Sequence, residues 1–316
     1  MSSGASRGGP EGRRCCIHIS FHITRRLLLD LIKLTILFRL CQGFYTDVSL
    51  AHKGASYYLP HRGRWIGQGE GLSYRGSAVY FLSDTHIRGG SETERFREER
   101  LVSFLCHIMG RAEALYILGD LFDFWFEYRS VIPRTGGRVL YALHHLVSSG
   151  TPVICISGNH DFWLGSYISD EMGIRIARRP LWVRHQGMRI FMAHGDEFFR
   201  DLGYLALRYA LRHPLSIRLF RLIHPDLGAL LAEALSQASR SISPAKFRKV
   251  REELLRTAEE KFREGADVVA FGHLHVPMLR RCGGHTLVVL GDWIRNFTYA
   301  VLEDGEVSLR RWEPSS

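Results

Sequence analysis

Gly119-Asp120-Leu121-Phe122-Asp123-Phe124-Trp125 follows directly on an apolar run, Ala114 to Leu118. The run predicts a buried strand that ends in glycine, and glycine lets the backbone turn tightly. Asp120 is therefore expected to face a shallow site at the strand end. A carboxylate placed directly after a buried strand is costly unless a cation or a partner compensates its charge. The stretch thus predicts a charged partner at this point.

The same arrangement recurs four more times along the chain. Each of these stretches brings Asp, His or Asn to the end of an apolar run: Phe81-Leu82-Ser83-Asp84-Thr85-His86, Cys155-Ile156-Ser157-Gly158-Asn159-His160-Asp161, Phe191-Met192-Ala193-His194-Gly195-Asp196 and Ala270-Phe271-Gly272-His273-Leu274-His275. These side chains are the ligand types of a divalent-metal site. A single one would usually be structural, so the joint pattern carries the prediction.

Composition bounds the class of protein. The chain has 316 residues, of which 46% are hydrophobic, enough for one large domain or two small ones. Its net charge of +10 predicts an anionic partner: nucleic acid, a phosphorylated substrate or an anionic membrane. Six cysteines lack zinc spacing, and Cys155 lies within an apolar strand, so reduced cysteines in a cytosolic protein are expected.

Residues 1–76 do not resemble the rest of the chain. We expect an N-terminal extension that is unstructured or results from a start codon assigned too far upstream. Alternatively, residues 25–40 form a basic amphipathic helix on a membrane surface. No transmembrane helix is expected, because the most apolar window, residues 27–41, contains Asp30, Lys33 and Arg39.

From Ala78 onward, strands alternate with helices, which predicts an α/β layered core. The predicted helices are 91–110, capped by Ser91 ahead of Glu94, and 136–149. The predicted strands are 78–83, 114–118, 152–157, 189–193, 267–271, 286–290, 297–302 and 306–312.

Residues 198–263 interrupt this alternation. The segment is helical in pattern, rich in Leu and Arg, and broken by Pro214, Pro225 and Pro244. We interpret it as a helical insertion between two metal-bearing strands. Two interpretations of its basic residues stay open: a solvated helical face, or a lid over a large anionic, partly apolar ligand.

The motifs D-x-H, G-D-x-x-D, G-N-H-D, H-G and G-H-x-H occur complete and in order between Asp84 and His275. In this combination the chain resembles the calcineurin-like metallophosphoesterase family over residues 78–312. The resemblance implies a four-layer αββα sandwich of two mixed sheets with a helical lid insertion. It places an N-terminal extension at 1–76, a metallophosphoesterase domain at 77–316 and the lid at 198–263.

The resemblance also implies a two-metal centre. One ion would be bound by Asp84, His86, Asp120 and His275, and the second by Asp120, Asn159, His194 and His273, with Asp120 as the bridge. Two divalent ions about 3.5–4 Å apart clamp a phosphoryl group and activate a bridging water as hydroxide. Mixed carboxylate, amide and imidazole ligands favour Mn²⁺; Fe and Zn²⁺ also fit, and Ca²⁺ does not. Asp196 is a candidate acceptor for the outer ring nitrogen of His194.

Two further side chains are predicted to be catalytic. The family pattern places His160 near the leaving-group oxygen, oriented by Asp123. A histidine paired with a carboxylate stays protonated near neutral pH and can donate a proton. The alternative is that Asp123 only caps the loop after Leu121. Asp161 is expected to shape the turn.

The residues around the motifs resemble one branch of the family, the UDP-2,3-diacylglucosamine diphosphatases. The similar stretches are residues 121–128, residues 159–164 and Leu290-Gly291-Asp292-Trp293. Enzymes of that branch cleave a pyrophosphate to give UMP and 2,3-diacylglucosamine 1-phosphate in lipid A synthesis. Some members carry Arg where His160 stands, so the leaving group is stabilised differently there. Four aromatic residues either bind acyl chains or belong to the core: Phe124, Trp125, Phe126 and Trp163.

The resemblance therefore implies a metal-dependent hydrolase that acts on a UDP-linked glycolipid. It would be cytoplasmic and peripheral on the anionic inner-membrane surface, and its oligomeric state stays open. One alternative is a phosphoesterase of another substrate: a phosphodiester, a nucleotide or a phosphoprotein. No base-reading module is present, so no nucleic-acid partner is expected. A non-enzymatic scaffold of this fold is disfavoured, because every metal position is intact.

Overall fold

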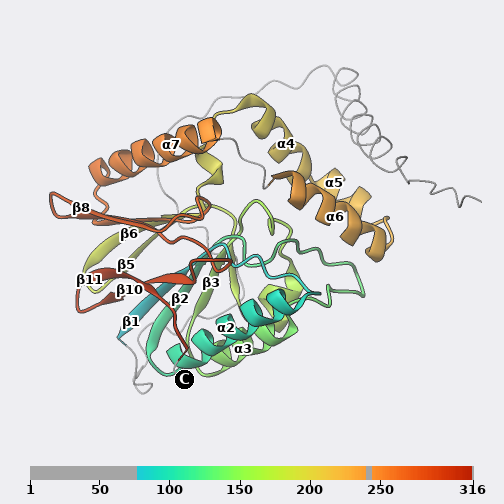
Figure 1. The fold of residues 1–316 in the computed structure, drawn as a ribbon, viewed down its shortest axis with the longest axis horizontal. Helices are drawn as coiled ribbons and strands as arrows, with labels where there is room; N and C mark the ends of the chain where they lie inside the picture. Colours follow the sequence, from blue (N-terminus) through green and yellow to red (C-terminus); the bar gives the residue numbers. More distant parts are fainter. Residues whose placement is uncertain (1–76, 240–243, 315–316) are drawn as a thin grey trace, which may run out of the picture. The chain divides into compact units, whose positions relative to one another are not determined.

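Two β-sheets stacked face to face form the centre of the molecule in a computed structural model (Figure 1). The structure describes residues 77–239 and 244–314. The expectations for residues 1–76 lie outside this range. Among the described residues, no helix combines the length and the apolar character needed to cross a bilayer.

The first sheet has the strand order β11-β10-β1-β2-β3-β4. The strands β1 to β4 are parallel, whereas β10 and β11 are antiparallel to their neighbours, so the sheet is mixed. Its strands are β1 (Ala78–Leu82), β2 (Ala112–Leu118), β3 (Val153–Ile156), β4 (Arg175–Ala177), β10 (Thr298–Glu303) and β11 (Glu306–Arg311).

The second sheet has the order β5-β6-β7-β9-β8. Its three inner strands are parallel, and each edge strand is antiparallel to its neighbour. Its strands are β5 (Leu181–His185), β6 (Met188–Ala193), β7 (Val268–Phe271), β8 (Met278–Cys282) and β9 (His285–Val289). Two mixed sheets confirm the predicted sandwich.

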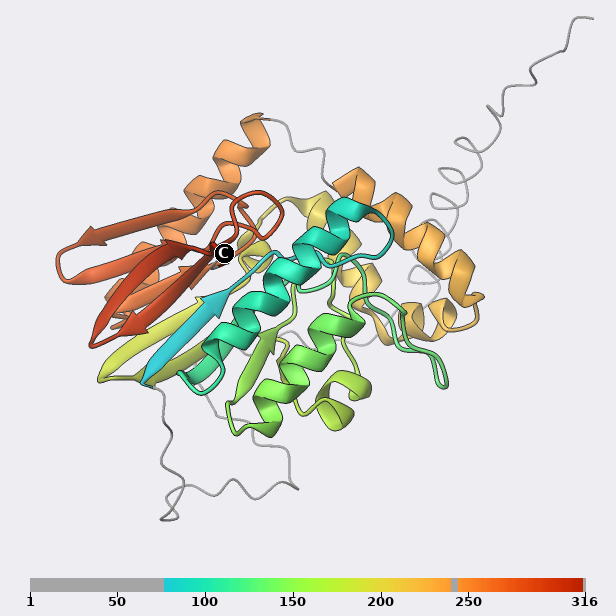
Figure 2. The same ribbon diagram turned by 60° about the horizontal axis from the view of Figure 1, so that its bottom comes forward.

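Side chains alternate between two cores along each central strand, as the period of two requires. In β1, Val79 and Phe81 pack between the two sheets. Tyr80 and Leu82 point the other way, toward α2 (Glu92–Ile108) and α3 (Gly137–Ser148). On the outer face of the second sheet lies α7 (Pro244–Arg263) (Figures 1 and 2). The layers are therefore αββα.

The predicted helical segment, residues 198–263, contains α4 (Leu202–Arg212), α5 (Pro214–Phe220), α6 (Pro225–Ser239) and α7, and the short turn η2 (Asp196–Phe198) ends at its first residue. Each of the three predicted interruptions, Pro214, Pro225 and Pro244, is the first residue of a helix. Proline suits that position because its missing N–H is not needed there and its φ is preset. The expected breaks are confirmed as helix starts.

The predicted cap at Ser91 is confirmed, since its side chain accepts from the Glu94 N–H at 3.3 Å. Three strands were not predicted: β4, β5 and β8. All three are edge strands with half-exposed or exposed residues, so they have no continuous apolar run. The turn η1 (Tyr167–Glu171), a single π-helical turn, was also not predicted.

Candidate dinuclear metal centre

The seven predicted ligands follow five strands that run parallel to a neighbour in one of the two sheets. Parallel strands bring their carboxyl ends to one edge, where active sites of open α/β sheets lie. Asp84 and His86 follow β1, Asp120 follows β2, and Asn159 follows β3. His194 follows β6, and His273 and His275 follow β7. The structure brings all seven together.

Around Asp84, four donor atoms from three loops converge. Asp84 Oδ1 lies 3.5 Å from His275 Nε2 and 3.8 Å from His86 Nε2. His86 Nε2 in turn lies 3.5 Å from Asp120 Oδ2. We call these residues the Asp84 cluster.

A second group of donors surrounds His194. Its Nε2 lies 3.3 Å from Asp120 Oδ2, 3.1 Å from Asn159 Oδ1 and 3.2 Å from His273 Nδ1. We call these four residues the His194 cluster. Asp120 Oδ2 belongs to both clusters, which is the position expected of a bridging ligand.

Both carboxylates are anchored through one oxygen and present the other to the clusters. Asp84 Oδ2 accepts from the His273 N–H at 2.8 Å, and Asp120 Oδ1 accepts from the His160 N–H at 2.9 Å. Within the described residues, the buried atoms Asp84 Oδ1 and His86 Nε2 have no hydrogen-bond partner. Buried polar atoms without a partner are costly, and divalent cations would satisfy them. The donor set therefore fits two metal ions.

The outer ring nitrogens of three histidines face acceptors, which fixes their orientation. His194 Nδ1 donates to the Leu118 carbonyl at 2.7 Å. The other two contacts are His86 Nδ1 to Asp123 Oδ1 at 3.3 Å and His275 Nδ1 to Asp292 Oδ2 at 3.5 Å.

The expectation that Asp196 accepts from His194 is wrong. The Leu118 carbonyl occupies that place, and Asp196 accepts from the Tyr204 hydroxyl at 2.9 Å. The guanidinium groups of Arg208 and Arg212 lie 3.4 and 3.3 Å from the same carboxylate oxygen. Asp196 therefore anchors α4 beside the site.

Five of the candidate ligands have a left-handed backbone: Asp84, His86, Asp120, His273 and His275, with φ between 44° and 65°. For residues other than glycine this costs about 1–3 kcal/mol each and is typical of functional sites. Hydrogen bonds between loops hold the strained backbone, such as Asp84 N to Gly119 O at 3.1 Å and His86 N to Asp120 O at 2.9 Å. The buried Arg97 adds a bond to the Thr85 carbonyl at 2.8 Å.

Burial and neighbouring charges shift the pKa values of the site in opposite directions. Burial raises the pKa of Asp84, but His275 and His86 outweigh it and bring the pKa down to about 2. Burial likewise raises the pKa of Asp120, and His194 and His160 hold it well below its usual range. Burial and the neighbouring His194 lower the pKa of His273 to about 4. The centre thus combines two ionised carboxylates with a neutral His273. Burial lowers the pKa of His86 and of His194, but Asp123 and Asp84 raise that of His86 to about 9, and Asp120 holds that of His194 well above its usual range.

His160 is placed beside the clusters, but its expected protonation is wrong for this structure. Burial lowers its pKa and outweighs the carboxylate of Asp120, which raises it. Its Nδ1 lies 3.1 Å from the backbone carbonyl of Asp123 and 3.7 Å from the Asp123 carboxylate. Of these two distances, the one to the Asp123 backbone is the shorter.

The Asp123 carboxylate has other neighbours as well. Besides His86, it accepts from the Ser236 hydroxyl, which lies 3.0 Å from both of its oxygens. Ser236 belongs to α6, and nothing in the sequence pairs it with Asp123. Asp161 accepts from the Leu121 and Gly158 N–H groups at 2.8 Å each, so it shapes the turn as expected.

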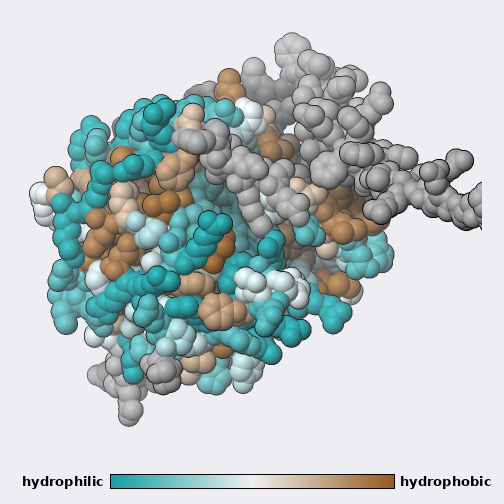
Figure 3. Space-filling view, viewed as in Figure 1, coloured by the Kyte–Doolittle hydropathy of each residue, from teal (hydrophilic) through white to brown (hydrophobic). Residues whose placement is uncertain are grey.

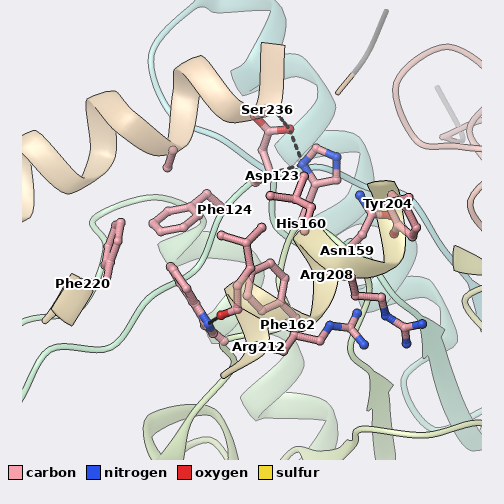
Figure 4. Close-up of a pocket in the computed structure, with 14 residues that line it drawn as sticks. Asp123, Phe124, Asn159, His160, Phe162, Tyr204, Arg208, Arg212, Phe220 and Ser236 are labelled. Carbon is pink, nitrogen blue, oxygen red and sulfur yellow. Dashed lines mark hydrogen bonds and ion pairs between the residues drawn. The ribbon is translucent and has the colours of Figure 1, made fainter. Parts of the chain in front are cut away.

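Beside the clusters lies a pocket of about 140 Å³ between the strand-end loops and α4 to α6 (Figure 4). Asn159 and His160 line one side, and Arg208 and Arg212 supply positive charge. The apolar lining comes from Phe124, Phe162, Trp163, Leu207, Leu211 and Phe220. Of the four aromatic residues in question, Phe124 and Trp163 line the pocket, whereas Trp125 and Phe126 belong to the buried core.

Fold and site together define a metal-dependent hydrolase of phosphoric esters or anhydrides. The sequence model described as calcineurin-like phosphoesterase matches residues 77–277, more than half of the chain. The protein belongs to the calcineurin-like phosphoesterase family, as its motifs predict.

The curated relatives align with this chain over most of their own length. A UDP-2,3-diacylglucosamine hydrolase of Porphyromonas gingivalis is 33% identical over 258 residues, which are 75% of this chain and 98% of the relative. A protein of the same name from Pseudomonas syringae pv. tomato is 31% identical over 229 residues, 69% of this chain and 88% of the relative. Among solved structures, an archaeal phosphodiesterase matches with 13% identity and a TM-score of 0.39, over 74% of this chain and 98% of that one.

The two clusters depend on a close approach of β3's loop to Asp120. A Cβ atom at Gly158 would lie 2.1 Å from Asp120 Oδ1 and 2.6 Å from Asp120 N. We expect Gly158→Ala to displace Asp120 and to weaken Mn²⁺ binding by about 10–100-fold, the range for residues that support metal ligands. Equilibrium dialysis of Mn²⁺ against the purified chain measures this.

Gly137→Ala is the matched control, because a Cβ there meets nothing within 4 Å. It should bind Mn²⁺ as the unsubstituted chain does. Equal affinity in the Gly158 and Gly137 variants would contradict the close approach.

Proposed function

We propose that this chain hydrolyses the pyrophosphate bond of UDP-2,3-diacylglucosamine and releases UMP and 2,3-diacylglucosamine 1-phosphate, a step of lipid A synthesis. The observation that carries the proposal is the pair of clusters sharing Asp120, set beside an apolar pocket with two arginines. A diacylated substrate needs apolar surface for its chains and cations for its diphosphate. The names of the curated relatives support this substrate.

The residues of the two clusters would hold two divalent cations, with Mn²⁺ preferred by the mixed oxygen and nitrogen donors. When bound, such cations supply Lewis acidity for the phosphoryl group and lower the pKa of a water molecule. The left-handed loops fix the donor atoms before the substrate arrives, so little reorganisation is needed.

His160 and the arginines would serve the substrate. With Nδ1 donating to the Asp123 carbonyl, the neutral ring of His160 leaves Nε2 as the atom that takes up a proton. A diphosphate bound beside it would raise the pKa of His160 and favour its protonated form. That form donates to the departing phosphate oxygen as the P–O bond breaks. Arg208 and Arg212, at the pocket wall, would offset the remaining phosphate charge.

Residues 198–263 would act as the lid of the domain at 77–316. Their helices α4, α5 and α6 supply much of the pocket lining, including Leu207, Leu211 and Phe220. Acyl chains placed against these residues and against Phe124 and Trp163 would lose their contact with water, which stabilises the complex in proportion to the apolar area buried.

The same helices would bind an anionic membrane at its cytoplasmic face. Most of the large apolar residues that are exposed in the described part of the chain belong to α4, α5 and α6 or the turns beside them, with Leu202 82% and Leu222 83% exposed. Apolar surface is visible over α5 and α6 in Figure 3. Residues 202–225 contain four arginines and neither Asp nor Glu. Apolar side chains among cations suit a bilayer of anionic lipids.

The substrate is tested by incubating the chain with Mn²⁺ and UDP-2,3-diacylglucosamine and identifying the products. UMP should appear only with metal, and Asp120→Ala should reduce kcat by at least about 10²-fold, because both clusters lose a donor. Asp304→Ala, in an exposed turn, is the control. Rapid cleavage of a simple phosphodiester without UMP release would favour the alternative, a phosphoesterase of another substrate.

His160→Ala separates its role from that of the ligands. We expect kcat to fall by about 10²–10⁴-fold, the usual contribution of a general acid or base, while the bound metal stays at the unsubstituted level. Metal content by atomic emission and kcat with the lipid substrate are measured on the same sample. Loss of metal along with activity would make His160 a structural residue of the centre.

Membrane binding is tested by sedimentation with vesicles rich in phosphatidylglycerol. The double variant Leu219→Asp/Leu222→Asp should bind at least about tenfold more weakly, because each leucine contributes about 1.5–3 kcal/mol when fully buried and the new charges are repelled. Tyr141→Asp, which changes a residue 70% exposed on α3, is the control. Unchanged binding of the double variant would show that these helices do not meet the lipid.

A further inference from the structure

The stretch Leu290-Gly291-Asp292-Trp293 contains none of the candidate metal ligands, yet its loop touches two of them. The Trp293 N–H donates to the Asp84 carbonyl at 3.1 Å. Asn296 Nδ2 donates to the His275 carbonyl at 2.8 Å. Asp292 Oδ2 lies 3.5 Å from His275 Nδ1. The loop therefore holds the Asp84 cluster by main chain and side chain.

Asp292 is built into this loop through its other oxygen. Its Oδ1 accepts from three successive N–H groups, those of Ile294, Arg295 and Asn296, at 3.0, 2.8 and 3.0 Å. The residue is 5% exposed. With Oδ1 committed to the backbone, the direction of Oδ2 toward His275 is fixed.

His275 has more need of such support than its neighbours. Its side chain is 36% exposed, compared with 5% for His86 and 0% for His194. On one side its ring stacks on His86, with centroids 5.0 Å apart. Surrounding packing therefore restricts His275 less than His86 or His194, and a polar contact has more effect on its orientation.

We propose that Asp292 is a positioning residue for His275. Its Oδ2 accepts the proton of Nδ1, which leaves the lone pair of Nε2 directed at Asp84 Oδ1, 3.5 Å away. The inference rests on the proposed role of His275 as a metal ligand. It assigns a function to a carboxylate 17 positions beyond that histidine (292 − 275).

Asp292→Asn is the informative change. The amide oxygen can still accept from the three backbone N–H groups, so the loop keeps its support. The amide nitrogen then faces His275 Nδ1 and donates to it. This favours the tautomer whose proton is on Nε2, where it blocks the lone pair that a metal needs.

The experiment is a titration of the metal-free full chain with Mn²⁺, without substrate. The unsubstituted chain should bind two ions. In Asp292→Asn, the affinity for one ion should fall by about 10–100-fold while the other stays as before. The melting temperature without metal should match that of the unsubstituted chain. Asp304→Asn is the matched control and should change neither quantity.

A second variant tests the assignment even if the loop is disturbed. In a His275→Ala background, Asp292→Asn should cause no further loss of affinity, because the two residues act through one contact. A further loss in that background would overturn the proposal, as would equal affinities in Asp292→Asn and the unsubstituted chain. An unsubstituted chain that binds no Mn²⁺ would overturn the metal role itself, which distinguishes the two failures.

Discussion

The structure depends on two carboxylates, Asp84 and Asp120, that are 0% and 1% exposed. Carboxylates so far from water cost several kcal/mol each unless opposite charge compensates them. Around them the chain gathers imidazoles and aims one free oxygen of each carboxylate at the same small region. The framework that holds these charges together consists of the two sheets, their parallel inner strands and the loops that follow those strands.

The framework also carries considerable backbone strain. Five left-handed residues at about 1–3 kcal/mol each amount to about 5–15 kcal/mol, as much as the net stability of a whole domain. Three apolar cores and hydrogen bonds between the loops offset this cost. In the described part of the chain, five of the eight non-glycine residues with a left-handed backbone are candidate ligands, so much of this strain lies at the site where geometry matters.

The sequence predicts those features that depend on neighbouring residues, and it does not predict those that depend on tertiary contacts. Apolar runs that end in Asp, Asn or His predicted the central strands and the site. In these stretches the residues that form the buried strand and the residues that carry the chemistry are adjacent in the sequence. Edge strands such as β4 were missed because they alternate little and are half-exposed. The protonation of His160 was misjudged because burial is a tertiary property. The partner of His194 is a backbone carbonyl, that of Leu118, which no side-chain pattern can show.

A hydrogen bond between side chains 113 positions apart ties the helical insertion to the centre. Ser236, on α6, donates to the Asp123 carboxylate, and the same carboxylate lies 3.3 Å from Nδ1 of His86. A movement of α6 away from the strand ends would remove a donor from Asp123. The carboxylate would then attract the His86 proton more strongly and alter the electron density at Nε2. Since α6 also lines the apolar pocket, the position of the insertion and the basicity of a candidate ligand are physically coupled. A ligand that displaced α6 from the strand ends would therefore also change a candidate metal ligand.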